Sequence, residues 1–183
     1  MMKRMYTLIA LLVTCLGVAF FKENGGFVKQ RVPKVGVLTL MHHPALDQIY
    51  KGYVHELARE GYHNGKNIKI EYENANGDQS NLKTMASKLV NDNCSVIYGI
   101  TTPAAQAVAN STTKTPIVLG AVTDPKSAGL IKNNRHPGGN ISGVSDQAPI
   151  KEQLGLIKRF MPKMKTLGVI YTSSDASAVA GYH

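Results

Sequence analysis

From Val35 onward, short apolar runs alternate with longer amphipathic stretches, and this alternation restricts the chain to few folds. Apolar runs of a few residues are typical of buried strands, whereas apolar side chains spaced three and four residues apart form one face of a helix. Continuously apolar strands separated by helices are typical of a parallel sheet, because a parallel connection needs a long crossover. The sequence therefore predicts an α/β fold in which a parallel, Rossmann-like sheet is flanked by helices.

The predicted elements can be placed by residue. We expect strands at 35–40, 68–72, 95–100, 117–122, 140–144 and 167–171, and helices near 46–58, 79–90, 102–109 and 150–161. Residues 68–72 alternate apolar with charged side chains, which favours an edge strand. Asp78 is a predicted N-cap, and Thr102-Pro103 is expected to open its helix with a capping hydroxyl and an early proline.

The N-terminus carries an export signal or a membrane anchor. Residues 1–5 contain two cations, Lys3 and Arg4, residues 6–21 are 16 residues without a charge, and Lys22 ends the apolar stretch. This pattern is typical of a secretory signal. Three outcomes stay open for residues 1–21: cleavage after the small residues 17–19, an uncleaved anchor, or lipidation of Cys15, whose preceding residues partly match a lipobox. Each outcome predicts export, to the outer face of the cytoplasmic membrane or into the medium.

Residues 22–32 are polar and glycine-containing, so they are interpreted as a linker that leads to a folded part beginning at Pro33. The net charge is +9, but the basic residues are scattered and no tryptophan is present. Nucleic-acid binding requires clustered positive charge, so it is not expected. Cys94 lies in an apolar run and is interpreted as a buried side chain, and the two cysteines do not indicate a disulfide or a zinc site.

The motifs of common enzymes are absent. No glycine-rich dinucleotide loop follows the first predicted strand, and the glycines at 138 and 143 lack the Lys-Ser/Thr pair of a phosphate loop. Catalytic residues and cofactors are therefore not expected. The adjacent His42 and His43 would point to opposite sides of an extended segment, which argues against joint metal binding.

Polar residues follow the predicted strands, where ligands of open parallel sheets bind. A carboxylate would suit Thr102 at a helix N-terminus, and an ammonium group would suit Asp124 and Asp146. A bulky apolar group could pack on Met41 and His43, and Ser174 follows the last predicted strand. Simpler roles are available for several of these residues: Thr102 and Asp146 could cap helices, and Asp124 with Pro125 could form a turn.

The chain resembles the ABC transporter substrate-binding proteins of the tryptophan/tyrosine-binding type, which have a type I periplasmic-binding fold. The resemblance runs from about Lys34 to Asp175 and is carried by several motifs in order: 34–38 (KVGVL), 43–47 (HPALD), 50–52 (YKG), 77–80 (GDQS), 102–106 (TPAAQ), 123–125 (TDP), 137–146 (PGGNISGVSD) and 171–174 (YTSS).

The resemblance implies a two-lobed protein that binds an aromatic amino acid or a similar solute and presents it to an ABC permease. It places Thr102, Asp124, Asp146 and Ser174 in the ligand cleft, residues 33–147 in the first lobe, and residues 148–183 at the start of an incomplete second lobe. A chain with half of the cleft is expected to have reduced or lost binding. Two alternatives are a membrane-tethered sensory ectodomain and a small α/β enzyme.

Overall fold

The structure is a computed structural model that describes residues 6, 11–16, 18, 32–173, 175 and 177–179. The chain divides into two compact units, Met1–Val32 and Pro33–His183. The second unit contains the sheet and its helices, so it holds every element that positions the candidate site.

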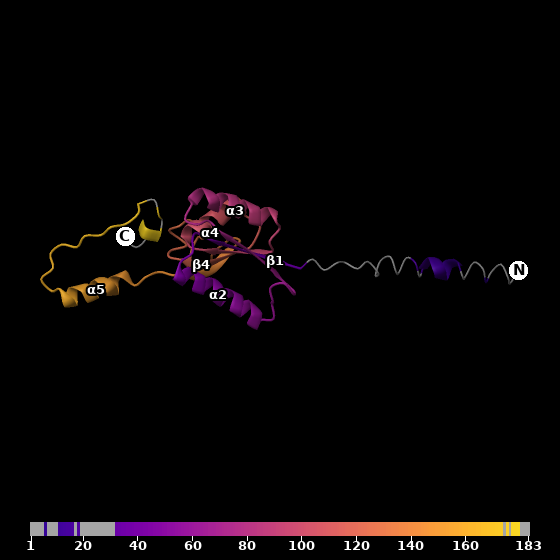
Figure 1. The fold of residues 1–183 in the computed structure, drawn as a ribbon, viewed down its shortest axis with the longest axis horizontal. Coiled ribbons are helices and arrows are strands. Elements are labelled where there is room, and N and C mark those ends of the chain that lie inside the picture. The colour runs from indigo at the N-terminus through magenta and orange to yellow at the C-terminus, as the bar shows by residue number, and fades with distance from the viewer. Residues whose placement is uncertain are drawn as a thin grey trace. The chain divides into compact units, whose positions relative to one another are not determined.

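A single five-stranded parallel sheet forms the centre of the second unit (Figure 1). The strand order is β2-β1-β3-β4-β5. The strands are β1 (Lys34–Thr39), β2 (Lys69–Asn74), β3 (Val96–Ile100), β4 (Ile117–Val122) and β5 (Ile141–Ser145). The predicted parallel α/β fold and the predicted edge position of the second strand are both confirmed.

Helices cover the two faces of the sheet unequally. The helices α3 (Gln79–Asn91) and α4 (Thr102–Ser111) pack on one face, and α2 (Pro44–Arg59) packs on the other. In Figure 1, α2 and α3 lie on opposite sides of the sheet. Neighbouring residues of a strand point to opposite faces, so Leu38 of β1 joins the larger core beneath α3 and α4 while Val37 joins the smaller core beneath α2.

Two predicted helix starts have different outcomes. Asp78 caps α3 as predicted, because its carboxylate accepts a hydrogen bond from the Ser80 amide at 2.7 Å. The predicted capping role of the Thr102 hydroxyl is wrong. The N-cap of α4 is Thr101, neither threonine makes a side-chain capping bond, and Thr102 is already helical, with Pro103 in the first turn as expected.

The helix predicted near 150–161 is confirmed as α5 (Ile150–Phe160), and none of its residues is buried. The strand predicted at 167–171 is wrong, because residues 164–172 have no regular structure. Ile170 is fully exposed there. A strand needs hydrogen-bonded neighbours, and no other described residues pair with this segment. That residues 148–183 begin a second lobe stays a prediction.

Within the described part of the chain, no helix is both long and apolar enough to cross a membrane. Most of residues 1–31, and with them most of the predicted signal and linker, lie outside the described residues. Cys15 is described and exposed. Its lipidation, the signal and the anchor therefore stay predictions.

Candidate functional site

The carboxyl ends of four neighbouring strands meet at one edge of the sheet. The aligned pairs at this edge are Thr39 with Ile100, Ile100 with Gly120, and Val122 with Ser145. Two backbone bonds extend the alignment beyond the strands: the Thr101 amide donates to the Gly120 carbonyl at 2.9 Å, and the Asp146 amide donates to the Val122 carbonyl at 2.8 Å. The predicted site residues Thr102, Asp124 and Asp146 therefore follow adjacent strands at this edge.

The connection from β3 to α4 is one residue long, because β3 ends at Ile100 and α4 begins at Thr102. Gly99 makes this possible. A Cβ atom on Gly99 would lie 2.9 Å from the Cα atom of Ala105, so only glycine lets the first turn of α4 lie directly on the strand. Thr101 must make the whole turn, and the first amides of α4 are held at the carboxyl edge of the sheet, where the helix dipole favours an anion.

Two buried hydroxyl groups lie at this turn without a partner among the described residues: Thr101 Oγ1 and Thr102 Oγ1. A buried polar atom without a hydrogen bond is costly, so such atoms are uncommon in stable folds and call for an explanation. The two residues differ in access. Thr102 is only 2% exposed and fully enclosed, whereas Thr101 is half-buried.

The Asp124 carboxylate is committed to its own turn. It accepts hydrogen bonds from the Ser127 hydroxyl at 2.6 Å and from the amides of Ser127 and Lys126, each at 3.1 Å. These bonds, with the Ser127 hydroxyl first, lower the pKa of Asp124 below its ordinary value. The structure therefore supports the turn interpretation of Asp124 more directly than the ligand interpretation.

We predict that Asp124→Asn reduces the acid sensitivity of the fold. Because its pKa is lower in the folded state, the Asp124 carboxylate stabilises the fold above the ordinary aspartate pKa of about 4, and this stabilisation is lost as the pH falls through the lowered pKa. Urea unfolding at pH 7 and pH 3 should show a smaller drop in midpoint for the variant than for the wild type. Asp146→Asn is the control and should leave the drop unchanged.

The Asp146 carboxylate is exposed and makes no hydrogen bond or ion pair to any other described residue. Its backbone is fixed nevertheless, because its amide bonds to β4 and the preceding Ser145 hydroxyl donates to the Thr123 carbonyl at 2.9 Å. Asp146 does not cap α5, whose N-cap is Pro149. An uncommitted carboxylate on a fixed backbone is suited to bind an ammonium group.

His43 caps α2, since its Nδ1 atom accepts a bond from the Ala45 amide at 3.3 Å, whereas His42 pairs with Asp47 at 3.3 Å. The two histidines therefore have separate partners. In the described residues, no group of three or more His, Cys, Asp or Glu side chains could hold a metal ion. Ser174 lies outside the described residues, so its place in the site stays a prediction.

The structure adds residues that sequence reasoning does not select. Beside Asp146 is a hollow of about 380 Å³ with Tyr53 and Tyr98 in its wall, their rings stacked at 4.3 Å. Burial raises the pKa of both tyrosines above the ordinary value of 10.0. The sequence pattern indicates Tyr53 only as part of a helix face, and a tyrosine within the apolar run of β3 is the signal available for Tyr98.

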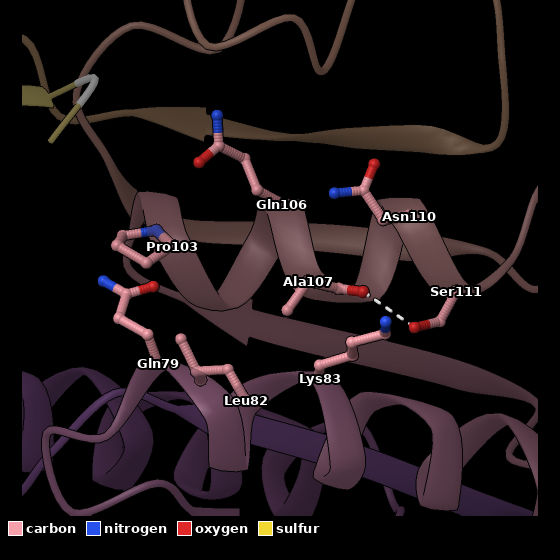
Figure 2. A pocket seen from close by; sticks show the side chains of 8 residues that line it. All are labelled: Gln79, Leu82, Lys83, Pro103, Gln106, Ala107, Asn110 and Ser111. Carbon is pink, nitrogen blue, oxygen red and sulfur yellow. Dashed lines mark hydrogen bonds between the residues drawn. The ribbon is translucent and has the colours of Figure 1, made fainter. Parts of the chain in front are cut away.

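A second hollow, of about 500 Å³, lies between α3 and α4 (Figure 2). Gln79 and Lys83 line it from α3, and Pro103 and Ser111 line it from α4. Figure 2 shows Gln106 and Asn110 extending from α4 on the side away from α3. Gln106 is already bonded to the Ala128 carbonyl, and none of the predicted site residues lines this hollow.

Comparison with known proteins decides the family. The profile of the family described as ABC transporter substrate binding protein matches residues 34–182. The chain belongs to this family. The resemblance inferred from the sequence is confirmed. Membership of a family of substrate-binding proteins also supports the prediction that the chain is not an enzyme.

Several relatives of this chain are known. A tyrosine-binding protein from Clostridioides difficile (strain R20291) is 43% identical over 156 residues, which cover 85% of this chain and 45% of the relative. The structure of an ABC domain in complex with L-Trp from Streptococcus pneumoniae is 43% identical, with a TM-score of 0.78 over 82% of this chain and 50% of that chain. The structure of a conserved domain protein from Vibrio cholerae is 39% identical, with a TM-score of 0.78 over 82% of this chain and 51% of that chain. The chain thus spans about half the length of these relatives.

Proposed function

We propose that this chain carries the first lobe of an extracytoplasmic solute-binding component of an ABC importer, and that its solute is an aromatic amino acid. The observation that carries the proposal is the strand-end edge, where the N-terminus of α4 follows β3 and the uncommitted carboxylate of Asp146 follows β5, with β4 between the two strands. The helix N-terminus attracts a carboxylate and the Asp146 carboxylate attracts an ammonium group, and an amino acid carries both of these charged groups.

Two further observations support an aromatic side chain. The hollow beside Asp146 has apolar and aromatic walls that include Tyr53, Tyr98 and Val144. One relative is named a tyrosine-binding protein, and the structure of another is a complex with L-Trp. An aromatic ring on these walls would bury apolar area while the ammonium group reaches Asp146.

Export and partnership complete the proposal. The cationic start and the 16 uncharged residues support delivery to the outer side of the membrane, with or without attachment through Cys15, and the family supports an ABC permease as partner. Residues 148–183 would begin the second lobe. Since these 183 residues span about half the length of the relatives, we expect them to bind the solute only weakly on their own.

The test measures binding of L-Trp to the purified full chain by ligand-observed saturation-transfer NMR, a method suited to weak affinities. Asp146→Asn should weaken L-Trp binding by about ten- to a hundredfold, because a charge-assisted hydrogen bond contributes about 1.5–3 kcal/mol. Asp124→Asn is the matched control and should leave the affinity unchanged, since that carboxylate is bonded within its turn.

The ligand supplies a second control. N-acetyl-L-tryptophan has no ammonium group, so the wild type should bind it less tightly than L-Trp, and Asp146→Asn should remove the difference. Failure of the wild type to bind any aromatic amino acid at millimolar concentration would contradict the proposal. Equal L-Trp affinity of wild type and Asp146→Asn would remove Asp146 from the site.

A further inference from the structure

The helix α5 has an apolar face that is left exposed in the described chain. Apolar side chains recur at steps of three and four residues, so they share one side of the helix: Ile150, Leu154, Ile157 and, just past its end, Met161. Phe160 widens this face and is 78% exposed. No residue of α5 is buried or belongs to either core of the sheet. An isolated helix of 11 residues is only marginally stable in water, so α5 needs a surface on which to pack.

The charge of this part of the chain has one sign. The α5 segment, which we define as residues 150–165, contains one acidic residue, Glu152, and five basic ones: Lys151, Lys158, Arg159, Lys163 and Lys165. All five basic residues are exposed, and none of them forms an ion pair with another described residue. The segment therefore combines an exposed apolar face with positive charge that nothing in the described chain neutralises.

Two of these basic residues border the apolar face. Lys151 lies three residues before Leu154 and Lys158 lies four residues after it, so both lysines are neighbours of Leu154 on the helix surface. The aliphatic part of a lysine can lie along an apolar surface while its ammonium group extends to a polar layer. The surface of an anionic bilayer offers both environments, since acyl chains accept the apolar side chains and the headgroups attract the cations. A purely apolar protein groove would leave the cations without partners.

We propose that the α5 segment binds the surface of an anionic lipid bilayer, with the helix lying in the plane of the interface. Its apolar face would contact the acyl chains, and Lys151 and Lys158 would reach the lipid phosphates. The export proposed above brings lipid within reach of the segment, but the binding itself depends on residues 150–165 and requires no solute. Failure of lipid binding would therefore leave the proposed solute site intact.

A single tryptophan can report on this contact, because the chain has none of its own. The emission of full-length Phe160→Trp should shift to the blue with vesicles of equimolar phosphatidylglycerol and phosphatidylcholine, and should hardly change with phosphatidylcholine alone. Tyr62→Trp is the control, since Tyr62 is 52% exposed in the loop between α2 and β2, and its emission should stay constant. The apolar stretch before Lys22 could itself attach the chain to either kind of vesicle, so the signal must be specific to position 160.

Further substitutions in the Phe160→Trp chain test the two parts of the contact. The pair Lys151→Gln and Lys158→Gln should weaken binding to the mixed vesicles by about tenfold or more, because it removes two cations at the lipid surface. The pair Lys66→Gln and Lys114→Gln makes the same change of net charge at exposed positions elsewhere, and salt screening should keep its effect below about twofold. Leu154→Gln should abolish the emission shift while the melting temperature stays unchanged, since Leu154 contributes to neither core.

Four results would overturn the proposal. They are a Phe160→Trp emission that no vesicle shifts, an equal shift with both kinds of vesicle, equal weakening by the two lysine pairs, and an emission that is already blue-shifted before lipid is added. The last result would mean that another protein surface, in the same chain or in a second copy, covers the apolar face. Binding of L-Trp, measured on the wild type without vesicles, tests the proposed function separately.

Discussion

Leu38→Ala should lower the free energy of unfolding by about 2–5 kcal/mol, and urea or thermal unfolding measures the loss. Leu38 is completely buried in β1, between β2 and β3, and belongs to the larger core together with Leu82 and Leu89 of α3. Truncation removes apolar area from this core and leaves a cavity, because strands on both sides and helices above limit collapse into the space.

Leu167→Ala is the matched control, since it makes the same chemical change at a residue without regular structure that is 48% exposed. Its effect should stay within about 0.5 kcal/mol. Equal losses in the two variants would contradict the assignment of the core, because they would mean that residues near 167 pack as tightly as β1 does.

Local sequence patterns are sufficient to predict most of the fold. The apolar runs of β1, β3 and β4 and the helix faces of α2 and α3 carry their own periodicity, and Asp78 carries the chemistry of its cap. The alternation of apolar and charged residues in β2 also identifies an edge strand. On this strand, Lys69 Nζ and Glu71 Oε1 form an ion pair at 2.7 Å. These features depend on a few neighbouring residues, so they are visible without tertiary contacts.

The errors have tertiary causes. Residues 167–171 have a strand-like composition, but a strand forms only where a neighbour offers hydrogen bonds, and that information is not local. Thr102-Pro103 resembles a capped helix start. The helix begins one residue earlier than this pattern indicates, because α4 lies directly on β3 and leaves room for only Thr101 between them.

The candidate site is predictable in outline, since parallel strands bring their carboxyl ends to one edge whatever the details of the loops. The role of each residue is not predictable in the same way. Asp124 and Asp146 look equivalent in sequence. In the structure, the Asp124 carboxylate accepts hydrogen bonds from the Ser127 hydroxyl and two amides, whereas the Asp146 carboxylate accepts none from the described residues. Such differences depend on loop conformation and on hydrogen bonds that sequence spacing does not specify.

Gly99→Ala should destabilise the fold by about 1–3 kcal/mol, although alanine is often the better residue in terms of chain entropy. The added methyl group would lie 2.9 Å from the Cα atom and 3.2 Å from the amide nitrogen of Ala105, and both are backbone atoms that cannot rotate away. The first turn of α4 must therefore move off β3. Because Thr101 alone joins the two elements, this movement should also disturb the strand-end edge.

Gly155→Ala should have the opposite effect and stabilise its helix. Gly155 lies inside α5 and is exposed, and a methyl group added there would meet no atom within 4 Å outside the local backbone of the helix. Alanine at this position should therefore favour the helix by roughly 0.5–1 kcal/mol. Because α5 has no buried residue, that gain should appear in helix content by circular dichroism and only weakly in the unfolding midpoint.

Heteronuclear NMR spectra can show where in the chain each of the two glycine variants changes the structure. The amide signals of residues 99–105 should shift in Gly99→Ala, because the first turn of α4 moves, and they should stay in place in Gly155→Ala. Unchanged signals and unchanged stability in Gly99→Ala would mean that α4 does not lie against β3 as closely as described. The reason for the strained turn at Thr101, whose φ is 89°, would then be lost, because a longer gap between strand and helix would not force one residue to make the whole connection.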